Sequence, residues 1–269
     1  MDILALIKER RSVRTFDGAP LREEDAKKIL AFAEKTENPY ALPIAWTLLD
    51  AKKDGLSSPV IVGTDAYIAG KMKRVKHAEE AFGYAFEKIV LFARSLGVGT
   101  TWIAGTMDRS AFERAVGLGA DEVMPCVSPL GYAAKKMSLR ESVMRKGVKA
   151  DVRLDFGDLF FRDSFASPLT PDAAGDLAPA FEAVRLAPSA VNKQPWRVVL
   201  CGNKAHFYLK HSRGRVPEGW DIQKVDLGIA MCHFELAAGQ CGKSVSFEIA
   251  DPGLPAGDDT EYIASFLIG

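Results

Sequence analysis

The sequence predicts an α+β protein made of two tandem copies of one helix-and-strand unit, residues 1–150 and 151–269. Three observations indicate this. Apolar residues recur at helical spacing in some segments and form short runs bounded by Gly and Pro in others, as helices and strands do. The same order of elements occurs in both halves. Small residues of the two long helices coincide when the halves are aligned.

In the first half, residues 21–36 show an amphipathic pattern with acidic residues in the first turn, which is typical of a helix start. A long apolar helix follows later and is expected to stop at Gly97 and Gly99. After it, TTWIAG and MPCVSPLGYA are predicted as short strands or buried turns. The other predicted elements of this half are a helix at 21–36, strands at 45–51 and 57–68, and the long helix at 76–99.

The second half repeats this plan. A helix is predicted over 170–187, with Thr170 as its N-cap and Pro171 in its first turn. The strands WRVVLCG and AHFYLKH, a long helix over 224–242 and the strand KSVSFEIA follow. Chance similarity of two ordinary α+β segments is the alternative, but we favour a duplication because several aligned residues agree as well. These pairs are Trp46 and Trp196, Gly83 and Gly228, Ala85 and Ala230, Ala93 and Ala238, and Gly97 and Gly242.

Composition and charge exclude several classes of function. With 35 basic and 35 acidic side chains the chain has no net charge, so no overall field attracts it to nucleic acid or to an anionic membrane. Four cysteines without a C-x-x-C pair and four histidines without ligand spacing argue against a metal site and for reduced thiols. The N-terminus lacks the features of a secretory signal, and charges interrupt the apolar stretch 81–105. We therefore expect a cytoplasmic protein without a membrane span.

The first of two stretches with candidate binding chemistry is ERRSVRTF, which contains Arg10, Arg11, Ser12 and Arg14. Guanidinium groups and a hydroxyl suit a phosphate, because they donate charge-assisted hydrogen bonds to its oxygens. The alternative is a solvated basic helix end that the helix dipole favours. The cluster alone does not decide between them.

The second stretch, APSAVNKQPW, lies at a helix-to-strand junction. Small residues around Pro188, Ser189 and Ala190 let backbone groups approach a flat ligand, and the amide of Asn192 both donates and accepts hydrogen bonds. Such an amide matches the edge of a heterocycle. The alternative is an Asx-type turn before a strand, with Trp196 in the core.

Together RRSVRTF, APSAVNKQPW, the DLGIA of the second long helix and LGVGTTWIAG with its downstream LGY resemble the nitroreductase family of FMN-dependent oxidoreductases, over nearly the whole chain. The resemblance implies a nitroreductase-like fold: two tandem repeats of a central, mostly antiparallel sheet flanked by helices, packed as an intramolecular pseudo-dimer. Typical members are homodimers of shorter subunits that bind FMN at the dimer interface, and each subunit carries both motifs.

Each half of this chain retains only one of the two motifs. In the first half ENPYALPIAW stands in place of the amide loop, with Leu42 at about the position of Asn192. In the second half FRDSFASPL stands in place of the arginine cluster, with Arg162 and Ser164 kept and Asp163 opposing a phosphate. The resemblance therefore implies the single-chain branch of the family, with one composite FMN site and one decayed site.

The family pattern also implies which residues contact FMN. The stretch GYAAKK, with Lys135 and Lys136, matches the family's basic segment after its G-Y strand, but less closely than the other motifs. At the position of Ala104 many members carry a larger or acidic residue. Gln194 and Trp196 are expected to support the amide loop. The assigned residues are Arg10, Ser12 and Arg14 for the phosphate and ribityl chain, with Arg11 nearby and Lys135 or Lys136 joining them, Pro188, Ser189, Ala190 and Asn192 for the isoalloxazine ring, and Ala104 and Gly105 for backbone N–H groups toward flavin N5.

The resemblance implies an NAD(P)H-dependent flavin oxidoreductase. FMN supplies the chemistry: it takes hydride at N5 from NADH or NADPH and passes it to a flat acceptor such as a quinone, nitroaromatic or enone, so no side-chain nucleophile is required. The expected partners are small molecules, and the chain is expected to act as a monomer. The alternatives are an FMN-binding or sensing module without NAD(P)H turnover and an outlier that consumes the flavin. The segment 210–223 is expected to cover the pocket, and its Arg215 and Trp220 either contact a substrate or only cap the pocket.

Overall fold

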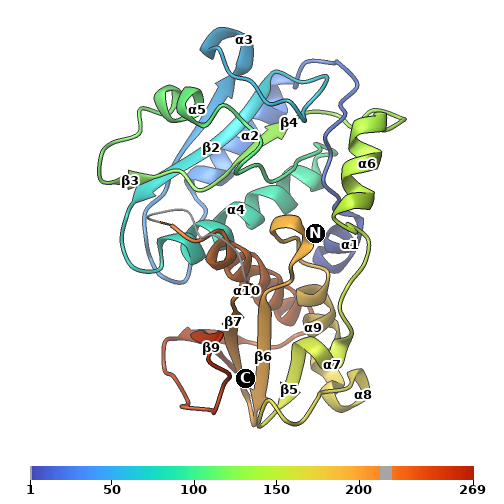
Figure 1. The fold of residues 1–269 in the computed structure, drawn as a ribbon, viewed down its shortest axis with the longest axis vertical. Helices are drawn as coiled ribbons and strands as arrows, with labels where there is room; N and C mark the ends of the chain where they lie inside the picture. The colour runs from blue at the N-terminus through green and yellow to red at the C-terminus, as the bar shows by residue number, and fades with distance from the viewer. Residues whose placement is uncertain (1, 213–219) are drawn as a thin grey trace. The chain divides into compact units, whose positions relative to one another are not determined.

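The computed structural model of the chain describes residues 2–212 and 220–269 (Figure 1). The chain divides into two compact units, each described here by itself. One unit is Glu9–Ala150, and the other combines residues 2–8 with 151–269. The first helix, α1 (Ile3–Glu9), belongs to the second unit apart from its last residue, because its first N–H group donates to the side chain of Gln240 (2.6 Å).

The unit Glu9–Ala150 is built on a sheet of four antiparallel strands. Its central strand, β2 (Ala66–Lys73), pairs on one side with β1 (Ala45–Asp50). On its other side β2 pairs with β4 (Val127–Leu130) and, further along, with β3 (Glu122–Val123).

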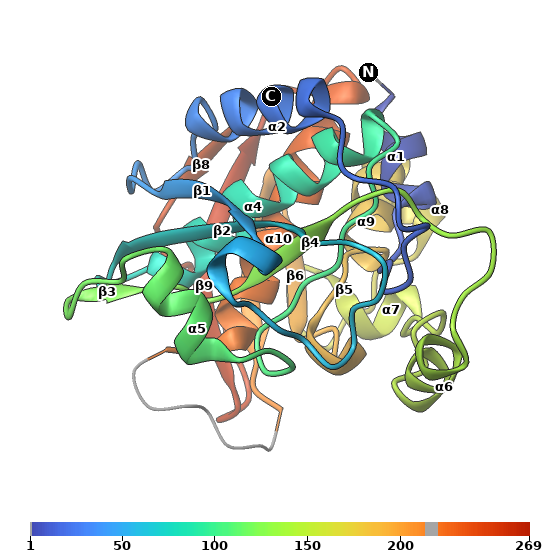
Figure 2. The ribbon, with the colours of Figure 1, turned by 90° about the horizontal axis from the view of Figure 1, so that it is seen from above.

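Helices cover both faces of this sheet. Figure 2 shows α2 and α4 over one face and α5 over the other. On the α4 face Trp46 lies in register with Gly70, which has no side chain and so leaves room for the indole ring. On the α5 face the rings of Tyr67 and Phe112 meet edge to face at 5.2 Å. The helices of this unit are α2 (Glu23–Glu34), α3 (Ala51–Asp54), α4 (Ala78–Ser95), α5 (Arg109–Ala115) and α6 (Leu139–Gly147).

The second unit contains a five-stranded sheet in the order β5-β6-β7-β9-β8, in which only the β5–β6 pair is parallel. Its core is aromatic, with Phe234 of α10 packed against Phe181 and Phe207. The strands are β5 (Phe160–Arg162), β6 (Trp196–Cys201), β7 (Lys204–Lys210), β8 (Val245–Glu248) and β9 (Thr260–Ile268). The helices are α7 (Phe156–Leu159), α8 (Pro171–Ala174), η1 (Gly175–Leu177), α9 (Ala178–Arg185), η2 (Ala190–Asn192) and α10 (Ile222–Gln240).

The predicted α+β class and the mostly antiparallel sheets are confirmed, and two predicted elements are wrong in part. The strand expected at 57–68 begins only at Ala66, because the preceding residues form a loop in which Gly63 takes a left-handed φ of 84°. The single helix expected at 170–187 is broken after α8, where Gly175 has φ 56°. Its N-cap is confirmed, since Thr170 Oγ1 accepts from the N–H of Ala173, the third residue of α8 (3.2 Å).

The two long helices end in the same way at positions that the repeat aligns. Gly97 and Gly242 both take a left-handed φ, 78° and 77°. In each case the following N–H closes the helix by donating to an alanine carbonyl, Ala93 in α4 and Ala238 in α10, at 3.0 Å. No helix in the described part of the chain is long and apolar enough to cross a membrane.

Candidate functional site

The RRSVR segment runs between two other segments of its own unit. Val13 donates its N–H to the carbonyl of Thr100 (2.9 Å), and Ser12 forms an isolated parallel β-bridge with the same threonine. A few residues on, Ala134 donates to the carbonyl of Thr15 (3.1 Å). The structure thus brings RRSVR beside the segments LGVGTT and GYAAKK, which are distant from it in the sequence.

The guanidinium group of Arg10 is buried and incompletely paired. Its side chain is 7% exposed, and its Nε lies 3.9 Å from Oε1 of Glu87, too far for a hydrogen bond. Nε and Nη1 find no hydrogen-bond acceptor among the described residues. Burial lowers the pKa of Arg10, and the carboxylate of Glu87 opposes that effect. Buried donors of this kind are costly, so an acceptor such as an anion is expected to satisfy them in the working protein.

A pocket opens beside this guanidinium. Its wall includes residues of the arginine segment and of both neighbouring segments. The residues that matter here are Arg10, Arg11, Val13, Gly99, Thr100 and Ala133, all of the unit Glu9–Ala150.

Several charged side chains gather at this end of the unit. Arg11 lies 3.3 Å from the buried carboxylate of Glu141 on α6. Burial lowers the pKa of Arg14, Glu141 raises it and Arg145 lowers it, which places both α6 residues near Arg14. Four guanidinium groups and two buried carboxylates therefore lie at this end of the unit, where the arginines could meet an anion such as a phosphate. The six residues are Arg10, Arg11, Arg14, Arg145, Glu87 and Glu141.

Sequence reasoning missed Glu141 and Arg145 because it did not predict α6. The signal was present: Ser138 and Glu141 form the S-x-x-E pattern of a helix start, and Ser138 Oγ accepts from the N–H of Glu141 (3.1 Å). Lys135 and Lys136 are exposed on the loop that leads to this helix. The assignment of these two lysines to the phosphate stays a prediction.

The segment after Thr100 is tied to the same buried carboxylate. The indole Nε1 of Trp102 donates to Oε2 of Glu87 (3.0 Å), and its ring packs edge to face against Phe86 at 4.8 Å. Glu87 therefore lies between the arginine segment and the WIAG segment. The sequence showed it only as a charge within an apolar helix.

Ala104 and Gly105 form a bend after this anchored tryptophan. Among the described residues none accepts a hydrogen bond from the N–H of either residue. Arg109 holds the bend from behind, since its Nη2 donates to the carbonyl of Ala104 (2.9 Å). The two N–H groups are therefore available to a ligand, which is compatible with the assignment that the sequence suggested.

The amide loop in the second unit has a strained backbone. Val191, Asn192 and Gln194 all take a left-handed φ, at 44°, 58° and 50°. Non-glycine residues in this region cost energy and persist only where surrounding contacts hold them, which is frequent at ligand sites. Here the N–H of Ala190 donates to both carboxylate oxygens of Asp226, at 3.0 and 3.1 Å.

Further contacts hold the loop from the segment that precedes α7. Asn192 Nδ2 donates to the carbonyl of Val152 (2.9 Å), and Asn192 Oδ1 accepts from Arg153 (3.3 Å). Gln194 is buried and its Oε1 accepts from the N–H of Leu154 (2.9 Å), in agreement with the supporting role expected of it. These contacts fix the position of the Asn192 amide within the loop.

Asp226 is the second functional candidate that sequence reasoning missed. It belongs to the DLGIA motif, but the sequence gave no role to its carboxyl group. The side chain is 3% exposed, and burial raises its pKa well above the ordinary value, although the Ala190 N–H opposes this. An acid inside an otherwise apolar helix was the available signal.

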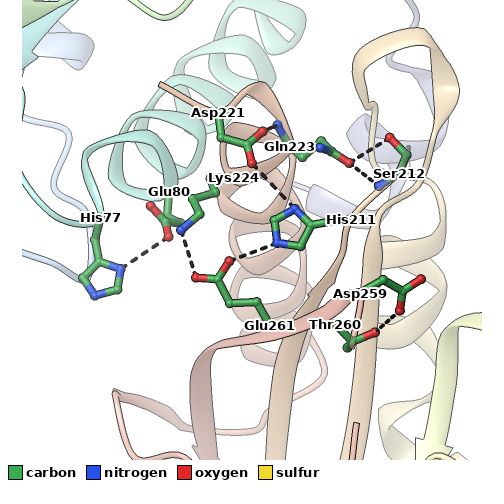
Figure 3. A network of polar contacts seen from close by, with 10 residues as sticks. All are labelled: His77, Glu80, His211, Ser212, Asp221, Gln223, Lys224, Asp259, Thr260 and Glu261. Carbon is green, nitrogen blue, oxygen red and sulfur yellow. Dashed lines mark hydrogen bonds and ion pairs between the residues drawn. The ribbon is translucent and has the colours of Figure 1, made fainter. Parts of the chain in front are cut away.

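A polar network surrounds His211 between the end of β7 and the start of α10 (Figure 3). His211 Nε2 lies 3.1 Å from Glu261, whose other oxygen accepts from Lys224 (3.0 Å). Of the segment that was expected to cover a pocket, residues 213–219, including Arg215, lie outside the described residues, and Trp220 is half-buried.

The counterparts of the two motifs serve local structure. Arg162 donates to the carbonyl of Ala173, and Asp163 has a left-handed φ of 60°. In ENPYALPIAW the side chain of Asn38 donates to the carbonyl of Leu42 (2.7 Å) and accepts from the N–H of Tyr40 (3.2 Å). These contacts are compatible with the predicted loss of the second site, which stays a prediction.

Comparison with known proteins agrees with this architecture. A family described as "Putative TM nitroreductase" matches residues 2–238. The crystal structure of a putative nitroreductase from Thermotoga maritima MSB8 superposes on this chain with a TM-score of 0.63 and 22% sequence identity. The match covers 99% of this chain and 94% of that one, so the two proteins share a fold. An FMN-dependent nitroreductase from Clostridium difficile R20291 covers 52% of this chain and 94% of its own, with 19% identity and a TM-score of 0.42. No curated protein matches the sequence.

Proposed function

Because this chain belongs to the nitroreductase family that matches it over residues 2–238, we propose that it is an FMN-dependent oxidoreductase with one composite flavin site per chain. Family membership supports a general oxidoreductase role. The flavin, its electron donor and the residues that bind it are the finer part of the proposal.

The observation that carries the proposal is the buried guanidinium of Arg10, which lies beside a pocket. Two of its nitrogens have no hydrogen-bond acceptor among the residues that the structure describes. A flavin phosphate would supply acceptors for these nitrogens and a negative charge beside Arg10 and Arg14. Arg11, Ser12 and Arg14 lie in the same segment, and Thr100 lines the same pocket. A sugar phosphate without the ring would satisfy these residues equally, so the ring end needs separate support.

Two features support a flat ring beyond the phosphate. The N–H groups of Ala104 and Gly105 are available as donors toward flavin N5. The loop of Pro188, Ser189, Ala190 and Asn192 provides small residues and an amide on a strained backbone. In this proposal the first unit holds the phosphate and N5, and the loop of the second unit lines the isoalloxazine ring.

Bound FMN would supply the redox chemistry, taking hydride at N5 from NADH or NADPH and passing it to a quinone or a nitroaromatic compound. The chain's own residues hold and orient the cofactor: the arginines pair with its phosphate, and a backbone N–H of Ala104 or Gly105 donates at N5. No side chain is assigned as an acid or a base. We also propose that the chain works as a monomer on small-molecule substrates, and a cytoplasmic location stays a prediction from the sequence.

The test is the visible spectrum of the purified protein, followed by anaerobic addition of NADH and then NADPH. We expect a yellow protein with one FMN per chain, a monomeric mass in solution, and bleaching by at least one nucleotide. A yellow protein that neither nucleotide bleaches would favour an FMN-binding or sensing module. Two FMN per chain would contradict the single composite site, and a colourless protein that FMN does not load would refute the proposal.

A further inference from the structure

Two buried carboxylates lie on the same helix of the first unit, and neither has a role in the function proposed above. Glu80 and Glu87 are both on α4, with side chains 1% and 0% exposed. Glu80 lies 3.3 Å from Nδ1 of His77, one helical turn away (Figure 3). Glu87 instead faces two segments of the proposed flavin site, through Arg10 and Trp102.

Glu87 acts on these two neighbours in different ways. Trp102 donates a hydrogen bond of 3.0 Å to Oε2, which fixes the position of the carboxylate. Arg10 makes no hydrogen bond with it, because its nearest nitrogen is 3.9 Å from Oε1, and that nitrogen has no acceptor in the described part of the chain. Glu87 therefore affects Arg10 through its charge. At this distance in a buried environment the interaction is strong, because little water screens it.

The charge of Glu87 has opposite consequences for the flavin-free and the phosphate-bound protein. A buried guanidinium without a counter-charge is strongly destabilising, and Glu87 offsets that cost. The same negative charge repels a phosphate that approaches Arg10. Arg145 acts in the opposite sense to Glu87, because its positive charge lowers the pKa of Arg10 and would attract a phosphate.

We propose that Glu87 is a specificity-determining residue of the anion end of the site: it is the fixed counter-charge that keeps Arg10 buried in the flavin-free protein, and it limits how strongly a phosphate-bearing ligand is preferred there. The inference rests on the proposed function for the identity of the ligand as FMN. Trp102 supports it by holding the carboxylate in place.

The substitution Glu87→Gln tests the charge with little change in shape. Its amide oxygen still accepts from Trp102, whereas the negative charge is lost. Riboflavin is the matched ligand, because it has the ring and ribityl chain of FMN but no phosphate. We expect the ratio of the riboflavin Kd to the FMN Kd to rise on the order of tenfold, the riboflavin Kd to stay within about twofold, and the flavin-free variant to melt at a lower temperature.

Glu80→Gln is the matched control, since it removes an equally buried carboxylate from the same helix. It should lower the melting temperature without changing the ratio of the two Kd values. A ratio that is unchanged or lower in Glu87→Gln would overturn the inference, and so would an equal rise in Glu80→Gln.

Inorganic phosphate separates this inference from the proposed function. If the wild-type protein bound neither flavin, the proposed function would fail, but the role of Glu87 at an anion site would still be measurable. Phosphate should then raise the melting temperature of Glu87→Gln more than that of the wild-type protein. An equal shift in both proteins would overturn the inference.

Discussion

Asp226 offers a direct way to test whether the amide loop binds the flavin ring. Its two carboxylate oxygens accept a hydrogen bond from the N–H of Ala190. This contact anchors a loop in which Val191, Asn192 and Gln194 take a left-handed φ. The substitution Asp226→Ala removes this acceptor. Asp226→Asn keeps one acceptor oxygen and removes the titrating group, so the two variants separate the geometry of the loop from its charge.

The size of the effect follows from the contact that is lost. A buried hydrogen bond contributes about 1 to 3 kcal/mol, with the upper end reached by a charged partner. The left-handed residues cost about 1 to 3 kcal/mol each, so the loop has alternative conformations close in energy once its anchor is removed. If binding requires the anchored loop, Asp226→Ala should weaken flavin binding by about 10- to 100-fold. Because the loop is proposed to line the ring, FMN and riboflavin should lose affinity alike.

The pKa of Asp226 also gives the effect a pH dependence. Burial raises this pKa well above its ordinary value of 3.8, so the folded protein holds the proton more tightly than the unfolded chain. The resulting stabilisation is complete below the unfolded pKa and is lost as the pH rises toward the folded one. In that window the free energy of unfolding of the wild-type protein should fall by up to ~1.4 kcal/mol per pH unit relative to Asp226→Asn.

The assays are flavin titrations and urea unfolding at several pH values. Asp176→Ala serves as the control, because it removes an exposed carboxylate of the same unit that pairs with Lys243. If Asp226→Ala binds both flavins as the wild-type protein does, the loop does not line the ring. If it lowers only the affinity for FMN, the loop acts on the phosphate instead. Parallel stability curves for the wild-type protein and Asp226→Asn would contradict the raised pKa.

Three further predictions concern the first unit. Arg14→Gln should weaken FMN binding by about tenfold or more and leave riboflavin binding unchanged in the same titrations, because it removes a partner of the phosphate only. Gly63→Ala should lower the free energy of unfolding, measured in urea, by about 2–4 kcal/mol, because Gly63 has φ 84° and a Cβ there would overlap the Phe16 carbonyl. Gly18→Ala is the control: Gly18 has φ 87° but open space around it, so this change should cost only about 1–2 kcal/mol. Burial raises the pKa of Tyr67 to about 12, so the stability that its neutral form contributes should be lost as the pH rises from about 10 to 12, and Tyr67→Phe should remove that loss.

The sequence predicted the elements whose patterns are long. The helices α2, α4 and α10 and the strands β1, β6 and β7 lie close to their expected places, because periodicity over many residues outweighs local irregularity. The short helices α5 and α6 were not predicted. Helices of this length are marginal by themselves. The helix α5 forms where Phe112 packs against Tyr67, a contact that nothing local in the sequence reports. In α6, by contrast, Leu139 and Val143 are exposed, and the capping pattern of Ser138 was a local signal that the prediction missed.

For the candidate site, local composition identified the segments but not what holds them. RRSVR and APSAVNKQPW are recognisable because the groups that meet a ligand are adjacent in the sequence. The partners of these segments are far away along the chain: Glu87 for Arg10 and Asp226 for Ala190. Glu87 appeared in the sequence only as one of the charges that interrupt an apolar stretch. Its burial implies a partner, but only the fold shows which one.

The two buried acids also bear on how the proposed site is divided between the halves. Aligning Gly83 with Gly228 places Glu87 opposite Cys232 and Asp226 opposite Ala81, so neither acid has an acidic counterpart in the other half. Each acid lies on the long helix of the half whose motif it contacts, Glu87 with the arginine segment and Asp226 with the amide loop. A buried carboxylate without its partner is costly, so loss of a motif would favour loss of the acid behind it. Each half therefore has a buried acid behind the motif that it retains and none behind the motif that it lacks. This pattern is what we expect of a duplicated chain in which one site is retained and the other has decayed.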